Sequence, residues 1–375
     1  MQMAQCRGAV PARETAETAQ YSGLHQLYRA STVGAACRYS AANKNDIREA
    51  GMKAPRFLLA LAAGLLVSCS GSTCFAQDYP SHAVRIIVPF GAGGPADVAA
   101  RLIGQSLQER FGQPFVIENR TGAGGVIGTV EAAKSPADGY TLLMMSNTQT
   151  ANESLLTPEQ RKYDLMRDLA PIAPVNSSDL VLVVNPQVPA KSLQEFIALA
   201  KAQPGKLNYA SSGQGTPYHM AGELFKAMAG IDVVHVPYRN SGEARSGVIG
   251  GQVQMMIDAV PAMVPNIADN QVRALATSGK ERSSVLPNVP TAGEAGVAGY
   301  EATIWLGLMA PAGTPKPIID KLNAAVTAVV RRPDIVKLWT DQGALPMAMT
   351  TDEFDKFLRG DIVKWADVVK KFNKS

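Results

Sequence analysis

The sequence predicts a doubly wound α/β fold with two domains and largely parallel sheets. Short β-rich runs alternate with amphipathic, helix-like runs from residue 84 to the C-terminus, which is the pattern of βαβ units. Glycine-rich turns at 90–97 and 119–128 each join such a β-rich run to a helical one. About 300 residues follow the N-terminal leader described below, enough for two domains of ordinary size.

The expected strands are short apolar runs bounded by turn residues. They lie at 84–89, 115–118, 140–146, 180–184, 207–210, 233–236, 253–257, 272–277 and 304–310. The expected helices have apolar residues spaced by three and four positions. They follow the two glycine-rich turns and then occupy 192–201, 218–228, a segment from Ser241, 316–331, 335–342 and 351–372.

The turn at 90–97 has the features of a helix start. Its glycines, Gly93 and Gly94 among them, allow backbone dihedrals and close approaches that a Cβ would forbid. Pro95 suits the first helical position, and Asp97 complements the helix dipole in the first turn. Because the first N–H groups of a helix have no partner inside it, such a turn is a ready anion site.

The turn at 119–128 repeats this arrangement, so we expect the two turns to form an anion site that needs no cationic side chain. Each turn alone could instead be ordinary punctuation between a strand and a helix. Neither turn has the complete G-x-G-x-x-G pattern and no G-x-x-x-x-G-K-[ST] motif occurs, which disfavours a nucleotide site. Glycine-rich loops at 211–217 and 238–242 would bring further helix N-termini from a second domain.

The N-terminal region is expected to be removed from the mature protein. Residues 1–51 show little periodicity and read as an over-extended start or a disordered extension. Residues 52–76 have a basic start, a short apolar run and small residues before a cut after Ala76, as a secretory signal does. The alternative is a lipoprotein, because Leu66-Val-Ser-Cys69 resembles a lipobox.

The composition of the mature chain excludes several classes of function. The full chain has 36 Lys and Arg and 32 Asp and Glu, and removing residues 1–76 leaves 28 of each. A chain with no net charge gives no reason to expect a nucleic-acid partner. The cysteines, Cys6, Cys37, Cys69 and Cys74, all precede Ala76, which rules out disulfides and cysteine metal sites in the mature chain.

Few residues suggest catalysis or metal binding. His82, His219 and His235 have no metal-ligand spacing, and no nucleophile-elbow motif occurs. His235 alternates with apolar residues, which favours a structural role. His219 could contact a ligand or cap its own helix. Asp258, which follows the run at 253–257, could cap a helix, but the cleft is favoured because α/β sites lie at strand ends.

Several segments together resemble the substrate-binding proteins of tripartite tricarboxylate transporters, the Bug family. The resemblance is carried by the segments at 79–97, 116–125, 134–143, 213–219, 236–239 and 286–294. Their order and spacing extend it over the whole mature chain. One departure is that Ala92 stands where the family often has proline, while Pro95 follows the glycines.

The resemblance implies a type II periplasmic binding protein (a Venus flytrap) with two doubly wound α/β lobes joined by hinge crossings. We place the first lobe at 77–177 plus 300–375 and the second at 178–299, with proline-rich crossings near 171–174 and 311–317. The implied protein is a periplasmic monomer without cofactor or catalysis. It would deliver a small organic carboxylate to a two-component membrane permease.

The site residues are carried over by motif position. First-lobe contacts would be Phe90, Gly93, Gly94 and Asp97, with Ser146 and Asn147 as weaker additions. Second-lobe contacts would be Ser212, Gly213, Thr216, His219, Tyr238 and Asp258. Two other readings stay open, namely an enzyme of small carboxylates that uses Asp97, Asp258 or His219, and a sensor subunit that presents its closed form to a receptor. The identity of the carboxylate is not predicted.

Overall fold

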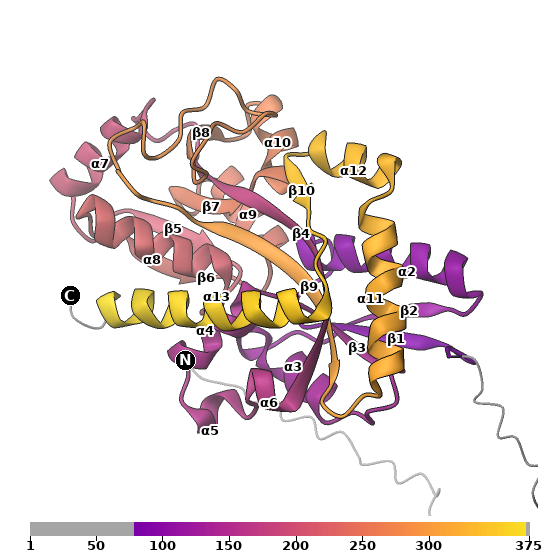
Figure 1. Ribbon diagram of the computed structural model, residues 1–375. Helices are drawn as coiled ribbons and strands as arrows, with labels where there is room; N and C mark the ends of the chain where they lie inside the picture. Colours follow the sequence, from indigo (N-terminus) through magenta and orange to yellow (C-terminus); the bar gives the residue numbers. More distant parts are fainter. Residues whose placement is uncertain (1–78, 373–375) are drawn as a thin grey trace, which may run out of the picture. The chain divides into compact units, whose positions relative to one another are not determined.

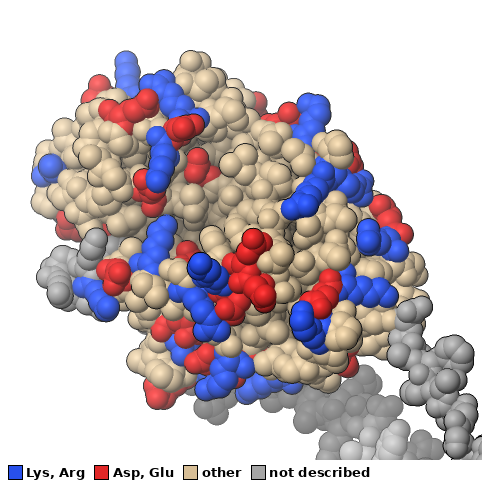
Figure 2. Space-filling view, in the orientation of Figure 1, with Lys and Arg blue, Asp and Glu red and all other residues tan. Residues whose placement is uncertain are grey.

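The computed structural model describes residues 79–372 (Figure 1). The expected extension at 1–51, the signal peptide at 52–76 and the lipobox cysteine Cys69 lie outside the described residues. Within the described part, no helix combines the length and the apolar character needed to cross a membrane. Figure 2 shows basic and acidic side chains interspersed on one face, without a single large basic patch.

The first lobe begins with two parallel strand pairs. Its elements are β1 (Val84–Val88), α2 (Pro95–Phe111), β2 (Phe115–Asn119), a 3-10 turn (Ala123–Gly125), α3 (Val126–Ala133) and β3 (Thr141–Ser146). Strand β1 pairs in parallel with both β2 and β3. Pro95 occupies the first position of α2, as the sequence predicted. Gly112 ends the helix in the left-handed conformation.

The second lobe repeats this plan. It contains α7 (Leu193–Ala202), β5 (Asn208–Ser211), α8 (Pro217–Ala229), β6 (Val234–Pro237), α9 (Ser241–Ile249), β7 (Met255–Ala259), α10 (Val260–Ala268) and β8 (Arg273–Thr277). Strand β5 pairs in parallel with β6 and β7. Ser192 caps α7 through its side chain, and Gly230 closes α8 in the left-handed conformation.

Two long antiparallel strands connect the lobes. They are β4 (Leu169–Val184) and β9 (Thr303–Pro311). Strand β4 pairs with β9 from Leu169 to Asp179 and then with β7 and β8 from Leu180 onward. The order of the main path of the sheet is β2-β1-β3-β9-β4-β7-β5-β6. The fold is therefore the predicted two-lobe α/β fold, but its sheets are mixed where parallel ones were expected.

The proline-rich segment expected near a crossing lies within one of the two connecting strands. The prolines at 171–174 belong to β4, which bulges next to them against β9. The change of pairing partner comes later, between Asp179 and Leu180. A strand tolerates proline at a bulge because no ladder hydrogen bond is lost there, so the proline pattern marked an irregular strand.

The C-terminal segment returns to the first lobe. Its elements are α11 (Lys316–Val330), α12 (Pro333–Thr340), β10 (Ala344–Pro346) and α13 (Thr351–Phe372). Helix α11 packs against α2 and β4, and β10 pairs with β4. Helix α13 lies along α4 (Asn147–Leu155) of the first lobe and also contacts α8 of the second (Figure 1).

The sequence missed α4, two short helices that follow it and α10. The short helices are α5 (Pro158–Arg161) and α6 (Leu165–Asp168). Helix α4 begins at a capping box. The Ser146 hydroxyl accepts from backbone N–H groups of the first turn, and the Gln149 side chain accepts from the Ser146 N–H. Its first residues are buried yet mostly polar, so no apolar period announces it.

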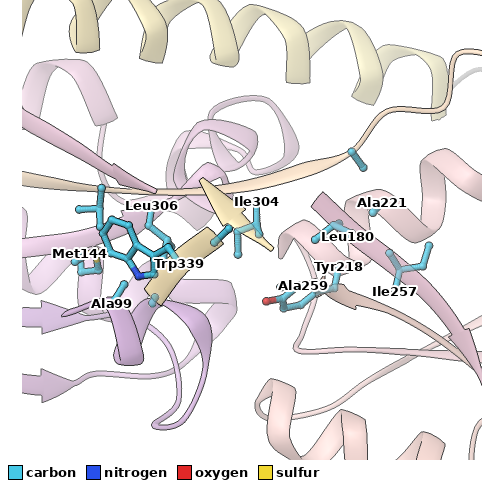
Figure 3. Packing of buried hydrophobic residues seen from close by; sticks show 14 of the residues in the cluster. Ala99, Met144, Leu180, Tyr218, Ala221, Ile257, Ala259, Ile304, Leu306 and Trp339 are labelled. Carbon is cyan, nitrogen blue, oxygen red and sulfur yellow. The ribbon is translucent and has the colours of Figure 1, made fainter. Parts of the chain in front are cut away.

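A continuous apolar core joins the two lobes along β9. Figure 3 shows Leu306 of β9 beside Met144 and Ala99 of the first lobe, and Ile304 between these and the second-lobe residues Leu180 and Tyr218. On α2 the buried face is formed by Ala99, Ile103 and Leu107, whereas Val98 is 56% exposed. The core thus holds β9 in place between the two lobes.

Candidate ligand-binding site

A cavity of about 410 Å³ lies between the loops at the carboxyl ends of the strands. This is where open α/β sheets bind their ligands. The first lobe contributes Pro89, Phe90, Gly91, Gly94, Pro95, Ala96, Thr121, Gly122, Ala123, Gly124, Gly125 and Ser146. The second lobe contributes Ser212, Gly213, Thr216, Pro217, Tyr218, Tyr238, Arg239, Asn240 and Ser241, and β9 adds Ile304 and Leu306.

Helix N-termini from both lobes face this cavity. Gly94 and Pro95 begin α2, Thr216 and Pro217 begin α8, and Asn240 caps α9 through its side chain. The first N–H groups of each helix lack acceptors within the helix and carry partial positive charge. The cavity wall is therefore suited to an anion.

The expected contacts divide into two groups. Those that line the cavity are Phe90, Gly94, Ser146, Ser212, Gly213, Thr216 and Tyr238. Those that do not line it are Gly93, Asp97, Asn147, His219 and Asp258. The residues of the second group are held by other parts of the protein, as the following contacts show.

Asp97 holds the first glycine-rich turn in place. Its carboxylate accepts from the Gly93 N–H (2.9 Å), from Arg101 (2.9 Å) and from Asn119 (3.0 Å). Burial alone would raise the pKa of Asp97, but the hydrogen bonds from Arg101, Gly93 and Asn119 outweigh it and lower that pKa. Since the carboxylate is already saturated, the structure gives Asp97 a role in positioning the loop, and no role at the cavity surface.

Asn147 is similarly occupied behind the wall. Its Nδ2 donates to the carbonyl of Thr303 at 2.9 Å, which ties α4 to β9. Ser146 does line the cavity, but its hydroxyl donates to Thr148 Oγ1 at 3.0 Å and accepts from the Thr148 N–H at 3.1 Å. The Ser146 hydroxyl is therefore already hydrogen-bonded, and Ser146 contributes mainly its backbone, at the start of α4, to the cavity wall.

The two second-lobe histidines form a neutral structural pair. Their rings lie 4.3 Å apart, and His235 is 2.6 Å from the Ser211 hydroxyl. His219 accepts from the Gly215 N–H at 3.2 Å, so it fixes the loop before its own helix. Burial lowers the pKa of His219, and burial together with the neighbouring His219 lowers the pKa of His235 to about 4. The structural interpretation of His235 is thus confirmed.

Asp258 lies inside β7 and is fully buried. It forms an ion pair with Arg245 of α9 at 3.1 Å and accepts from the Ala259 N–H at 2.7 Å. Burial raises the pKa of Asp258 to about 6, although the Arg245 charge and the Ala259 N–H act in the opposite direction. The preference for the cleft was wrong because the strand continues through Asp258, and its carboxylate pairs with a helix behind the cavity.

The second glycine-rich turn contributes a continuous wall that the residue assignments omitted. Thr121 through Gly125 all line the cavity, and Gly124 and Gly125 have positive φ. A Cβ on Gly125 would lie 3.4 Å from the Phe90 ring, and one on Gly124 would lie 2.6 Å from the Gln214 carbonyl oxygen of the second lobe. The sequence had marked this turn as part of an anion site without naming its residues as contacts.

Arg239 is the charged residue among those that line the cavity. It lies between Tyr238 and the α9 cap, Asn240. The other lining residues carry no charged side chain. Nothing in residues 79–372 gathers His, Cys, Asp or Glu side chains into a group that could hold a metal ion.

A two-lobe α/β fold with a cavity between strand-end loops defines a solute-binding protein of the Venus-flytrap class. The sequence matches the family described as tripartite tricarboxylate transporter family receptor over residues 99–374. It is also 38% identical over 310 residues to protein BugT of Bordetella pertussis, covering 82% of this chain and 95% of BugT. The chain therefore belongs to the tripartite tricarboxylate transporter receptor family, as the resemblance indicated.

Solved structures agree with this assignment. A structure titled as a periplasmic transporter is 39% identical, with a TM-score of 0.76, and the match covers 79% of this chain and 98% of that one. A Rhodopseudomonas palustris protein with adipate is 34% identical (TM-score 0.76; 79% and 99% covered). MatC from the same species, with bound malate, is 34% identical (TM-score 0.74; 78% and 100% covered). A further solved structure, 30% identical (TM-score 0.75; 79% and 99% covered), is titled as the periplasmic binding protein BugD, and membership of this family implies a periplasmic location.

Proposed function

We propose that this protein captures a small organic carboxylate in the cavity between its lobes and delivers it to a two-component membrane permease. The observation that carries the proposal is the composition of the cavity wall. The helix N-termini of α2, α8 and α9 face the cavity. Within the part of the chain that the structure describes, the residues that line this cavity include no acidic side chain. Donors of this kind stabilise an anion through charge-assisted hydrogen bonds, each of about 1.5–3 kcal/mol net.

The solved relatives support the same ligand class. The adipate and malate held by two of them are both carboxylates. In the present chain the lobes touch around the cavity, since a Cβ on Gly94 would lie 3.3 Å from the Ser241 hydroxyl. Closure of this kind excludes water from the anion and strengthens its contacts with the backbone donors.

The cellular role follows from the family. A periplasmic monomer would be exported by the signal at 52–76, or tethered by Cys69, and would offer its closed form to the permease. Its lobes would comprise 77–177 plus 300–375 and 178–299. We propose no catalysis, because the groups that the sequence offered as acid or base, Asp97, His219 and Asp258, do not line the cavity.

Binding of carboxylates to the purified protein tests the proposal. Thermal unfolding is measured with adipate, malate and a panel of other organic acids. A ligand at about 100 times its Kd stabilises a protein by about 2.7 kcal/mol. The proposal fails if no carboxylate shifts the unfolding transition and calorimetry also detects no binding.

A variant of the cavity wall identifies the site. A Cβ on Gly94 would lie 3.3 Å from the Gly91 carbonyl oxygen and from the Ser241 hydroxyl. Gly94→Val should therefore weaken calorimetric affinity at least about tenfold through overpacking. Gly360→Val is the matched control, because a Cβ there meets nothing within 4 Å. Equal affinity of both variants for the bound acid would exclude this cavity as the site.

A further inference from the structure

The loop between β5 and α8 brings Ser212, Gly213 and Thr216 to the cavity. Two of its residues have positive φ angles, Gly213 at 118° and Gly215 at 77°. Glycines leave a loop more conformational freedom than other residues do. The loop therefore keeps one conformation only where groups outside it hold it, and the contacts behind it decide the shape of this part of the cavity wall.

His219 holds the loop from behind. It lies in the first turn of α8, and its Nδ1 accepts from the Gly215 N–H at 3.2 Å. The Thr216 hydroxyl donates to the Gly213 carbonyl at 2.7 Å, which extends this support to two residues of the cavity wall. A ring nitrogen accepts a hydrogen bond only while it carries no proton. The contact with Gly215 therefore exists only when His219 is neutral.

Gly215 is also a point of contact between the lobes. A Cβ on Gly215 would lie 2.9 Å from Oδ1 of Asn152 and 3.1 Å from the Leu155 side chain, both on α4 of the first lobe. Asn152 in turn donates to the carbonyl of Gly124, a residue of the cavity wall, at 3.3 Å. A displacement of Gly215 would thus disturb both the wall and the fit of the lobes around the ligand.

Four titratable groups surround the His219 ring. The His235 ring of β6 lies 4.3 Å away, and Glu223 of α8 accepts from Tyr209 of β5 at 2.6 Å and from Lys226 of α8 at 3.0 Å. Burial lowers the pKa of His219 below its ordinary value of 6.5, Glu223 acts in the opposite direction, and Lys226 reinforces the effect of burial. The ring is therefore neutral at neutral pH and takes up a proton in acid.

We propose that His219 is a positioning residue of the ligand site: its neutral ring holds the loop at 211–216 in the binding conformation, and protonation of the ring releases the loop and weakens ligand binding in acid. A proton on Nδ1 places a second donor opposite the Gly215 N–H. The new charge adds little attraction for an anion, because the Glu223 carboxylate in the same cluster balances it. This inference rests on the proposed function, because it assumes that a carboxylate occupies the cavity.

Two substitutions separate the acceptor from the ring. His219→Asn supplies an amide oxygen as the acceptor, and this oxygen takes up no proton in this pH range. His219→Phe keeps a ring and has no acceptor. His82→Asn is the control, because His82 is exposed and stacks on Tyr140 outside the cavity lining. Thermal unfolding without ligand confirms that all the proteins are folded.

Calorimetry with adipate and malate at about pH 7.5 and about pH 5 measures the effect on affinity. Relative to His219→Asn, the wild type should lose about threefold or more in affinity between the two pH values. His219→Phe should bind about five- to tenfold more weakly than the wild type at the higher pH. His82→Asn should behave as the wild type. Titration of the ligands and of Asp258 is common to all the proteins and cancels in the comparison.

The inference is overturned if the wild type and His219→Asn respond equally to pH, if the wild type gains affinity in acid relative to His219→Asn, or if His219→Phe binds as the wild type does. A second measurement needs no ligand. The ¹⁵N resonance of the Gly215 amide should shift with protonation of the His219 ring in the wild type and stay constant in His219→Asn. Absence of this shift in the wild type overturns the inference even if carboxylates bind. Failure of every carboxylate to bind overturns the proposed function, and with it the effect on affinity, whether or not Gly215 shifts.

Discussion

Gly91 of the first lobe lies directly against Asn240 of the second, where a Cβ on Gly91 would come within 2.7 Å of the Asn240 Cβ. Gly91 belongs to the loop between β1 and α2, and Asn240 is the residue that caps α9. Both residues line the cavity. The closeness of the two lobes at this point therefore requires a residue without a side chain.

Gly91→Ala should hold the lobes apart and weaken ligand binding. The added methyl group cannot be accommodated while Asn240 stays in place, and overpacking of this kind costs about 1–3 kcal/mol. Since that cost falls on the contact between the lobes, affinity should drop about tenfold while the free energy of unfolding without ligand changes little. Calorimetry and small-angle scattering, with and without the bound acid, measure the two effects.

A second substitution serves as the control for Gly91→Ala. Asn240→Gly removes the Cβ that the new methyl group would meet, and glycine as an N-cap costs α9 only a few tenths of a kcal/mol. The double variant Gly91→Ala with Asn240→Gly should therefore regain most of the lost affinity. If the double variant binds no better than Gly91→Ala, the contact between these two residues does not govern closure.

The sequence was informative where local chemistry decides the structure. Pro95 marked the start of α2, and the apolar periods of 192–201 and 351–372 gave α7 and α13. The mixed pairing of the sheet was not predictable in the same way, because the direction of β9 relative to β3 depends on contacts far apart in sequence. Helix α4 was missed because its buried residues are mostly polar.

The candidate site was likewise predictable only where local chemistry decides the structure. The glycine-rich turns indicated where helix N-termini converge, and Phe90, Gly94, Thr216 and other expected residues line the cavity. Position in a motif says nothing about the direction of a side chain. Asp97 turns to Arg101 and Asn119, and Asp258 turns to Arg245 on a different element, so neither pairing could be read from the strand or loop that carries the carboxylate.

Asp97→Asn should lower stability at neutral pH more than it alters the cavity. The carboxylate holds Gly93, Arg101 and Asn119, and weakening charge-assisted hydrogen bonds costs about 1–3 kcal/mol. Because folding lowers the pKa of Asp97, its stabilisation exists above the unfolded-state pKa and is lost as pH falls through the folded-state pKa.

Denaturant titrations of the wild type and Asp97→Asn at several pH values measure this. The difference in unfolding free energy should be largest near neutral pH and should shrink in acid. A difference that stays constant from neutral to acidic pH would contradict the role assigned to the ionised carboxylate. Asp138→Asn, an exposed aspartate in a turn, is a suitable control.

Asp258 should give the opposite pH dependence. Folding raises its pKa to about 6, mainly through burial, so the folded state binds this proton more tightly than the unfolded state does. The stabilisation is complete below the unfolded-state pKa and is lost as pH rises through about 6. Relative to Asp258→Asn, the wild type should therefore lose up to about 1.4 kcal/mol per pH unit between about pH 4 and pH 6.

The comparison of the two proteins isolates this group. His235 titrates in the opposite sense, because burial lowers its pKa to about 4, but it is present in both proteins and cancels in the difference. The measurement is unfolding free energy against pH by denaturant titration. A difference that grows in favour of the wild type as pH rises would show that the Arg245 charge outweighs burial at Asp258.

Trp365 of α13 joins the two lobes on the side of α4 and α8. It is buried and packs in one cluster with Ala151 of α4, Met220 of α8 and Val369 of its own helix. The starts of α4 and α8, at Ser146 and Thr216, face the cavity. Trp365 thus contacts the same two helices whose N-termini contribute to the site.

Trp365→Ala should remove this contact between the lobes. Loss of a buried tryptophan costs about 3–5 kcal/mol of stability, and Trp365→Phe should cost much less because most of the apolar contact remains. Trp339→Ala provides the comparison, since Trp339 is equally buried but belongs to α12 and the main core. Both alanine variants should unfold more easily, but only Trp365→Ala should also change ligand affinity and the compaction on binding. If the two variants change ligand affinity equally, the Trp365 contact between the lobes does not influence ligand binding.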